Sequence, residues 1–203
     1  MPTTLLLTTL LTTMLLAAEG RRALPGPQTR AAVRVSAHHA AASPPPDASY
    51  EATVLERHNR YRALHGAPPL VWNTSMAADA ATWAQQVCDS RAFVGSPSQA
   101  GAYGENMAAG KDAAAMVDAW YGQVDKYDPE DPGSYAAAGQ FTQLVWRGTA
   151  QLGCAVVRTA INDGKACQLG ANKGKGVQVC RYFPAGNLGD WRVNVVADAS
   201  DGR

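Results

Sequence analysis

The chain has 203 residues, 46% hydrophobic and 17% charged, which is typical of a soluble globular protein with one ordinary domain plus appendages. Its net charge is +1; residues 1–49 hold four arginines and two acidic residues, so the remainder carries 14 basic and 15 acidic residues. No broad basic field is available, and we therefore expect no nucleic-acid partner.

The N-terminal stretch has two parts that differ in composition. Residues 5–18 form an apolar run closed by small residues, too short and too rich in threonine for a stable membrane span. The run predicts a secretory signal peptide over residues 1–18, although the usual positive charge before it is missing. Residues 19–49 hold Ala, Pro, Arg and His without periodicity, which predicts a disordered linker or pro-segment.

The folded domain is expected over residues 50–198, followed by a tail at 199–203, and it begins with helices. Ser49 is placed to cap a first helix whose apolar residues follow helical spacing. Ser75 is expected to cap a second helix, and a third begins near Asp112.

The second half of the domain has the patterns of strands and loops. Apolar residues predict strands at 152–159 and 177–183, and a weaker one at 191–195. Residues 90–110 are predicted to form a loop, because glycine, serine and proline are frequent there. Helices first and strands later favour an α+β fold.

Covalent features follow from the expected secretion. Four cysteines predict two disulfides, and the residues alone leave all three pairings open. None of the cysteines has CxxC spacing, which argues against a structural zinc site. Asn73 begins an N-glycosylation sequon with Thr74 and Ser75, so Ser75 serves the sequon, the helix cap, or both.

Several short segments follow one another in a characteristic order. They are His58-Asn59-Arg60-Tyr61-Arg62, Gly104-Glu105-Asn106, residues 139–146 (GQFTQLVW), Leu152-Gly153-Cys154, Val179-Cys180-Arg181-Tyr182 and Pro184-Ala185-Gly186-Asn187. Together they resemble the CAP superfamily, which unites cysteine-rich secretory proteins, insect antigen 5 and plant pathogenesis-related 1 proteins. The resemblance implies a secreted three-layer α-β-α sandwich with a central antiparallel sheet, and it implies the disulfides Cys88–Cys154 and Cys167–Cys180.

The resemblance also points to a cleft, where members with an intact site carry two His and two Glu able to hold a divalent metal. Here Glu105 matches the first Glu, but Gln123 stands at the second Glu and Gln140 at one His. The other His falls among residues 98–100, which contain none. A neutral amide is a weak metal ligand and no general base, so we predict no metal, no cofactor and no enzymatic activity. His58 is expected to be a core residue of the first helix.

The stretch before residue 139 is similar to a loop of fungal secreted CAP proteins that is implicated in sterol binding. Its candidate lipid-binding residues are Tyr127, Asp128, Pro129, Pro132, Gly133 and Tyr135. Proline restrains such a loop, and tyrosine rings offer flat apolar faces to a sterol. A sterol or other small lipid is therefore the expected ligand, and an ordinary surface loop is the alternative.

Two further functions remain open from the sequence. Plant relatives are thought to release a C-terminal signalling peptide at a junction that residues 180–187 partly match, although the same residues would also suit the turn that closes the last strand. A defence- or host-interaction-related protein with an extracellular protein partner is the other alternative.

Overall fold

The computed structural model describes residues 48–96, 102–160, 163–169 and 175–196. The predicted signal peptide, the 199–203 tail and all of the 19–49 segment except residues 48 and 49 lie outside the described residues. Among the helices that are described, none has the length and apolar character needed to cross a membrane.

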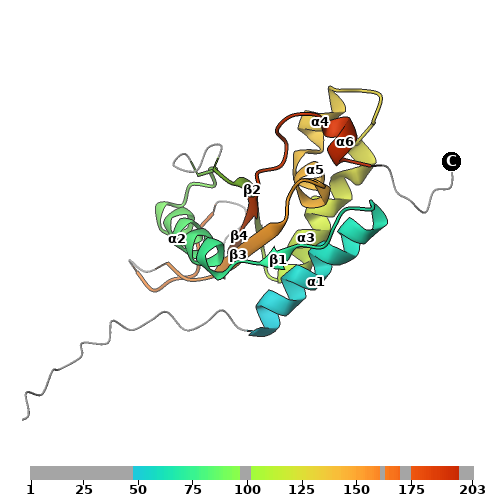
Figure 1. The fold of residues 1–203 in the computed structure, drawn as a ribbon. Coiled ribbons are helices and arrows are strands. Elements are labelled where there is room, and N and C mark those ends of the chain that lie inside the picture. Colours follow the sequence, from blue (N-terminus) through green and yellow to red (C-terminus); the bar gives the residue numbers. More distant parts are fainter. Residues whose placement is uncertain (1–47, 97–101, 161–162, 170–174, 197–203) are drawn as a thin grey trace, which may run out of the picture. The chain divides into compact units, whose positions relative to one another are not determined.

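A four-stranded sheet lies at the centre of the fold, with the strand order β1-β3-β4-β2 (Figure 1). The strands are β1 (Val71–Trp72), β2 (Gly104–Gly110), β3 (Gln151–Val157) and β4 (Gly176–Phe183). The three longer strands pair antiparallel, as expected, whereas the short β1 pairs parallel with β3. Strands alternate their side chains between the two faces, so β3 and β4 each contribute to two separate cores.

Helix α2 (Thr74–Ser90) covers one face of the sheet. Its buried stripe consists mainly of small residues, which lets the helix approach the strands closely. Where the helix begins, a Cβ on Gly153 of β3 would contact the backbone nitrogen of Ala77 and would lie 2.6 Å from the carbonyl oxygen of Asn73. Asn73 caps the helix by accepting a hydrogen bond from the Met76 backbone N–H, so the cap is Asn73 rather than the predicted Ser75.

Helices α1 (Ala48–Leu64), α3 (Ala113–Tyr121) and α5 (Gly139–Val145) cover the other face and complete the α-β-α sandwich (Figure 1). Smaller helical turns connect and close this layer. They are η2 (Gly122–Lys126), α4 (Ser134–Ala137) and α6 (Trp191–Asn194). The predicted strand at 191–195 is therefore wrong: Asp190 caps a helical turn there, and its carboxylate accepts a hydrogen bond from the Arg192 N–H.

Arg62 is a fully buried cation that ties α1 to the segment after α5. Its guanidinium donates to the carbonyl oxygens of Pro68, Leu144, Trp146 and Thr149 at 2.8 to 3.0 Å. Burial lowers the pKa of Arg62 to about 10, which leaves the group charged at neutral pH. The buried charge is thus satisfied by backbone oxygens instead of by a carboxylate.

The disulfide pairing implied by the resemblance is wrong. The bonds are Cys88–Cys167 and Cys154–Cys180. Cys154 and Cys180 lie opposite each other in the β3–β4 register, with 4.1 Å between their Cα atoms, and both belong to the core beneath α1. Cys88 belongs to the core beneath α2, on the other face of the sheet, and only Cys167 meets it there.

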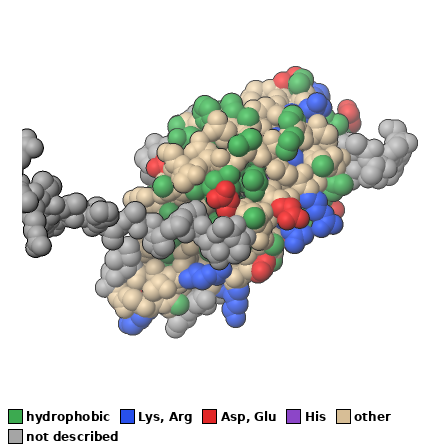
Figure 2. Space-filling view, turned by 60° about the horizontal axis from the view of Figure 1, so that its bottom comes forward, with side chains coloured by type: hydrophobic (Ala, Val, Ile, Leu, Met, Phe, Trp, Pro, Cys, Tyr) green, Lys and Arg blue, Asp and Glu red, His purple; other side chains and the backbone are tan. Residues whose placement is uncertain are grey.

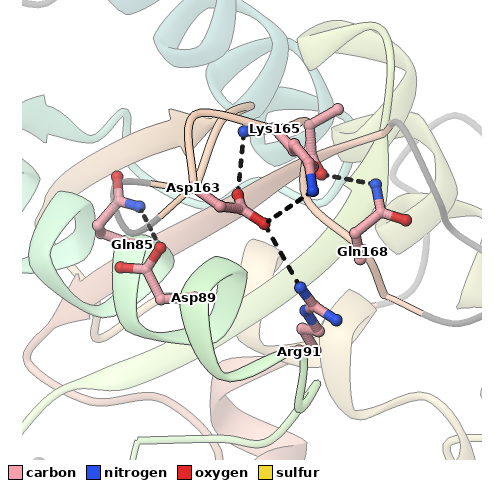
Figure 3. A network of polar contacts seen from close by, with 7 residues as sticks. Gln85, Asp89, Arg91, Asp163, Lys165 and Gln168 are labelled. Carbon is pink, nitrogen blue, oxygen red and sulfur yellow. Dashed lines mark hydrogen bonds and ion pairs between the residues drawn. The ribbon is translucent and has the colours of Figure 1, made fainter.

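A polar network links the C-terminal end of α2 to residues 163–168 (Figure 3). Asp163 accepts a hydrogen bond from the Lys165 N–H at 3.0 Å and forms ion pairs with Arg91 and Lys165 at 3.5 and 4.0 Å. Side chains of Arg91 and Lys165 are 58% and 73% exposed, so these pairs stabilise the loop only weakly.

Strand β2 corrects a second expectation, since residues 104–110 were predicted to lie in a loop. Glycine, asparagine and alanine are poor strand formers, and the segment is extended because all of its residues pair with β4. At this edge of the sheet the Met107 carbonyl oxygen accepts hydrogen bonds from the side chains of Trp120 and Gln140.

Candidate functional site

The two glutamines at the family's cleft positions bind each other. Gln123 lies in η2 and Gln140 in the first turn of α5. The Gln123 amide donates to Oε1 of Gln140 at 2.8 Å, and its own Oε1 accepts from the Gln140 backbone N–H at 2.9 Å. The Gln140 amide then donates to the Met107 carbonyl oxygen at 3.0 Å. The pair therefore joins a helix, a helical turn and the sheet edge by neutral hydrogen bonds.

A buried chain of polar groups continues from Gln140 to the first helix. Asn106 donates to the Gln140 carbonyl oxygen at 3.0 Å and to the Tyr182 hydroxyl at 3.1 Å. The Tyr182 hydroxyl in turn donates to Nε2 of His58 at 2.8 Å, because Nδ1 of His58 must carry the hydrogen that binds the Val54 carbonyl oxygen. Burial lowers the pKa of His58 to about 4 and raises that of Tyr182, so both groups are neutral at pH 7.

Glu105 is placed differently from the two glutamines. It lies two residues before Met107 on β2, so its side chain points to the same face of the sheet as that of Met107, which lies in the core beneath α2. One carboxylate oxygen pairs with Nη1 of Arg181 at 2.5 Å, and the other accepts from the Ser96 backbone N–H at 3.1 Å. The side chains of Arg181 and Glu105 are 3% and 17% exposed, so the ion pair is largely buried. The remaining carboxylate of the family site is thus committed to a structural partner.

The histidines of the domain are also committed to structure. His58 is fully buried, as expected for a core residue. His65, just after α1, is 1% exposed; its Nδ1 lies 2.8 Å from the Val196 carbonyl oxygen and its Nε2 lies 3.2 Å from the Tyr121 hydroxyl. Within the described ranges, no three His, Cys, Asp or Glu side chains are grouped closely enough to hold a metal ion.

The candidate lipid-binding loop, residues 127–135, follows η2 and includes the first two residues of α4. Its two tyrosines converge on Trp191 of α6, a residue that the sequence placed in a strand and that was not recognised as part of this surface. The Trp191 ring centroid lies 6.1 Å from that of Tyr127 and 6.4 Å from that of Tyr135. Tyr127 also packs on Phe141 of the core at 5.5 Å. The three rings form an aromatic surface that we call the 127–135–191 surface.

The chain on either side of Trp191 carries exposed side chains. Leu188 and Val193, close to Trp191 in the sequence, are 60% and 65% exposed, and the guanidinium of Arg192 lies 4.6 Å from the centroid of the Trp191 ring. Burial is the main cause that raises the pKa of Tyr127, to about 12, and it also raises that of Tyr135. Both hydroxyls therefore stay neutral at physiological pH, so the two tyrosines add no charge to the surface.

Figure 2 shows one face, on which acidic and basic side chains are interspersed rather than gathered by sign. That face offers no broad field of one charge to a polyanion.

Comparison with known proteins identifies the family. A family model described as CAP, the cysteine-rich secretory protein family, matches residues 55–182. The chain belongs to the CAP family.

Individual relatives support this assignment by their sequence identity. The yeast Protein PRY2 of Saccharomyces cerevisiae is 36% identical over 150 residues, which cover 72% of this chain and 41% of the relative. Human Golgi-associated plant pathogenesis-related protein 1 is 35% identical over 142 residues, which cover 66% of this chain and 82% of the relative. The chain thus spans less than half of its yeast relative.

A solved CAP-like structure shows the same fold. BmVAL-1 superimposes with a TM-score of 0.60 at 18% identity, over 77% of this chain and 88% of that chain. At this identity the similarity concerns the fold alone.

Proposed function

We propose that this CAP-family chain is a secreted, non-enzymatic protein that binds a sterol or another small lipid on the 127–135–191 surface. The observation that supports it best is the convergence of Tyr127 and Tyr135, from the 127–135 loop, on Trp191 of α6 in one partly exposed aromatic cluster. Flat aromatic rings suit the flat, apolar ring system of a sterol. The expected signal peptide over residues 1–18 supports secretion.

The loop is held in shape by its own polar groups. The Ser134 hydroxyl lies 2.9 Å from the Asp128 carbonyl oxygen and 2.8 Å from that of Asp131. The carboxylates of Asp128 and Asp131 accept hydrogen bonds from the backbone N–H groups of Glu130 and Gly133, both at 2.8 Å. A loop that is already ordered loses little conformational entropy when it binds a ligand. The acidic residues therefore shape the loop and leave the rings free to contact the lipid.

The absence of catalysis is proposed on chemical grounds. The Gln123–Gln140 pair contains amides, which neither take up nor release protons near neutral pH. The carboxylate of Glu105 is bonded to Arg181, and the imidazole of His58 is buried. None of these groups is positioned as a general base with access to solvent.

Release of a C-terminal peptide is less well supported. The segment after β4 is part of the fold: the Thr142 hydroxyl donates to Asn187 at 2.9 Å, and the Asn187 amide donates to the Gly139 carbonyl oxygen at 2.8 Å. Further on, Val195 is 3% exposed. Residues 184–187 thus form the connection that follows the last strand, which was the structural alternative for this motif.

Binding of radiolabelled cholesterol or ergosterol to the purified, secreted chain tests the proposal. Saturable binding is expected, with loss of most of it in a Tyr135→Ala/Trp191→Ala double variant. These positions are preferred over Tyr127, whose ring also packs in the core. Phe183→Ala is the matched control, since Phe183 is an exposed aromatic residue outside this surface. If the parent shows no saturable binding, or if the control and the double variant lose it equally, the proposal is wrong.

A further inference from the structure

A second aromatic feature lies where α2 begins, outside the 127–135–191 surface. It is an open groove of about 180 Å³. The groove is lined by Asn73, Ser75, Met76, Tyr103, Gln151 and Phe183. Within it the rings of Tyr103 and Phe183 meet edge to face, with centroids 6.1 Å apart, and Phe183 is 43% exposed. A partly exposed pair of aromatic rings in a hollow is suited to a ligand with an apolar face.

One wall of this groove carries an acceptor for a sugar. Asn73 is the first residue of the sequon Asn73-Thr74-Ser75, and Thr74 and Ser75 are exposed. The Asn73 amide is fixed in place: its Oδ1 accepts from the Met76 N–H at 3.0 Å, and its Nδ2 donates to Oε1 of Gln151 at 2.6 Å. An amide nitrogen has two hydrogens, so one stays available for substitution while the other binds Gln151.

We propose that Asn73 carries an N-linked glycan and that the first sugar ring lies in this groove against Tyr103 and Phe183. The proposal rests on the secretion that is part of the proposed function, but not on lipid binding. In the transfer, Nδ2 of Asn73 forms a bond to the anomeric carbon of a polyprenyl-diphosphate-linked oligosaccharide. The bond from that carbon to the diphosphate breaks, the diphosphate leaves with the electron pair, and Nδ2 loses one proton.

The attachment point and the groove support each other. A pyranose ring has an apolar C–H face that packs on aromatic rings by dispersion, and hydroxyls that suit polar neighbours such as Gln151. Because the sugar is tethered to a residue that lines the groove, its local concentration there is high and docking costs little association entropy. The glycan would thus cover aromatic surface that is otherwise exposed to water.

The attachment is tested by intact mass. The full chain is placed behind a secretion leader in eukaryotic cells, so that entry into the secretory pathway does not depend on residues 1–18. We expect a glycan on the parent and on Ser75→Thr, removable by peptide N-glycosidase F, and none on Ser75→Ala. Ser75→Ala leaves the Asn73 cap and its bond to Gln151 unchanged. A parent whose mass equals that calculated from its own sequence without sugar would overturn the site.

The docking is tested by a double-variant comparison of thermal midpoints. The glycosylated parent is expected to melt about 3 °C above Ser75→Ala, the shift for an interaction of ordinary size in a chain of this length. In a Phe183→Leu background this difference should vanish, whereas in the control background Leu188→Ala it should persist. Upfield shifts of the first sugar's protons in NMR, lost in Phe183→Leu, give a second readout.

An equal glycan effect on the thermal midpoint in all backgrounds would show that the sugar does not dock. Sterol binding is measured in a separate assay, so a failure of the glycan proposal and a failure of the lipid proposal give different results.

Discussion

Gly186 donates its backbone N–H to Oε1 of Gln143 at 3.0 Å, and this bond marks the point where three of the family's segments meet. Gln143 is 2% exposed and lies between the backbones of Gly104 and Gly186. Neither glycine has room for a side chain, because a Cβ at either position would contact the Gln143 amide. Glycine is required in two separate motifs because both must accommodate the same glutamine.

Replacing Gly186 with alanine should therefore destabilise the domain. The new Cβ would lie 2.5 Å from Nε2 of Gln143, and overpacking of this kind costs about 1–3 kcal/mol. Urea unfolding of the purified variant measures the change. The control is Gly122→Ala, where nothing lies within 4 Å and φ is −58°, so stability should stay unchanged or rise by up to about 1 kcal/mol.

A second variant separates the clash from a general effect of the position. Adding Gln143→Ala to Gly186→Ala should give a loss smaller than the sum of the two single losses, since the double variant has no side chain left to clash. Strict additivity would contradict the proposed contact.

The disulfide arrangement makes a prediction about relative stability. The bonds Cys88–Cys167 and Cys154–Cys180 join residues 79 and 26 positions apart, and all four side chains are buried. By the loop-entropy relation, removing the first bond by double alanine substitution should cost about 4.5 kcal/mol and removing the second about 3.5 kcal/mol. Denaturant unfolding of both variants checks the order. A non-reducing peptide map in which Cys88 is linked to Cys154 would contradict the arrangement itself.

His58 gives the domain a specific pH dependence. Its pKa is lowered by burial from 6.5 to about 4, so the unfolded state binds a proton more readily than the folded state between these values. The contribution of neutral His58 to the free energy of unfolding is fully present above pH 6.5. It is lost as the pH falls towards 4, by about 3 kcal/mol in total. Protonation would also leave the Tyr182 hydroxyl facing two donors, Asn106 and the imidazolium.

The measurement is the free energy of unfolding from pH 7.5 to 4 for the parent and for His58→Gln. The variant should be less stable at pH 7.5 and should lack the one-proton decline. Tyr50→Phe is a suitable control, because it changes a partly buried hydroxyl on the same helix without removing a group that titrates in this range. The same decline in parent and His58→Gln would assign the effect to other groups.

Much of the fold was predictable from the sequence, because helix and strand patterns there agree with burial. Helices α1, α2 and α3 and strands β3 and β4 lie close to the expected positions. Strand β2 was not predictable from local pattern: its glycines and alanines are extended only because β4 pairs with them. Residues 191–195 show alternation, yet the cap at Asp190 and the bond between the Val195 N–H and the Trp191 carbonyl oxygen produce a helical turn.

The candidate site was predictable only in part, because its partners depend on which face each residue occupies. The family motifs located Gln123 and Gln140, but nothing local indicated that the two amides would bind each other. The disulfide pairing failed for the same reason, since it depends on which face of the sheet Cys88 and Cys154 occupy. An alternation count places Cys154 on the same face as Leu152 and Cys180 on the same face as Tyr182, but only the register of β3 with β4 brings the two cysteines opposite each other.

The C-terminal segment provides the last prediction, which decides between a stable binder and a peptide precursor. Beyond Phe183 the chain contributes buried Val195 and two bonds from Asn194: its carbonyl oxygen accepts from Arg147 at 3.0 Å, and its Oδ1 accepts from the Gly148 N–H at 3.0 Å. A chain that stops after Phe183 should therefore be destabilised by more than about 3 kcal/mol, from the lost burial and the unpaired groups left behind. A chain that stops after Val196 keeps every one of these contacts and is the matched control.

Thermal unfolding compares the two truncated chains, and mass spectrometry of culture medium shows which form the cell releases. A secreted form that ends at Phe183 and unfolds like the control would mean that the segment is expendable, and the precursor function would then replace the one proposed here.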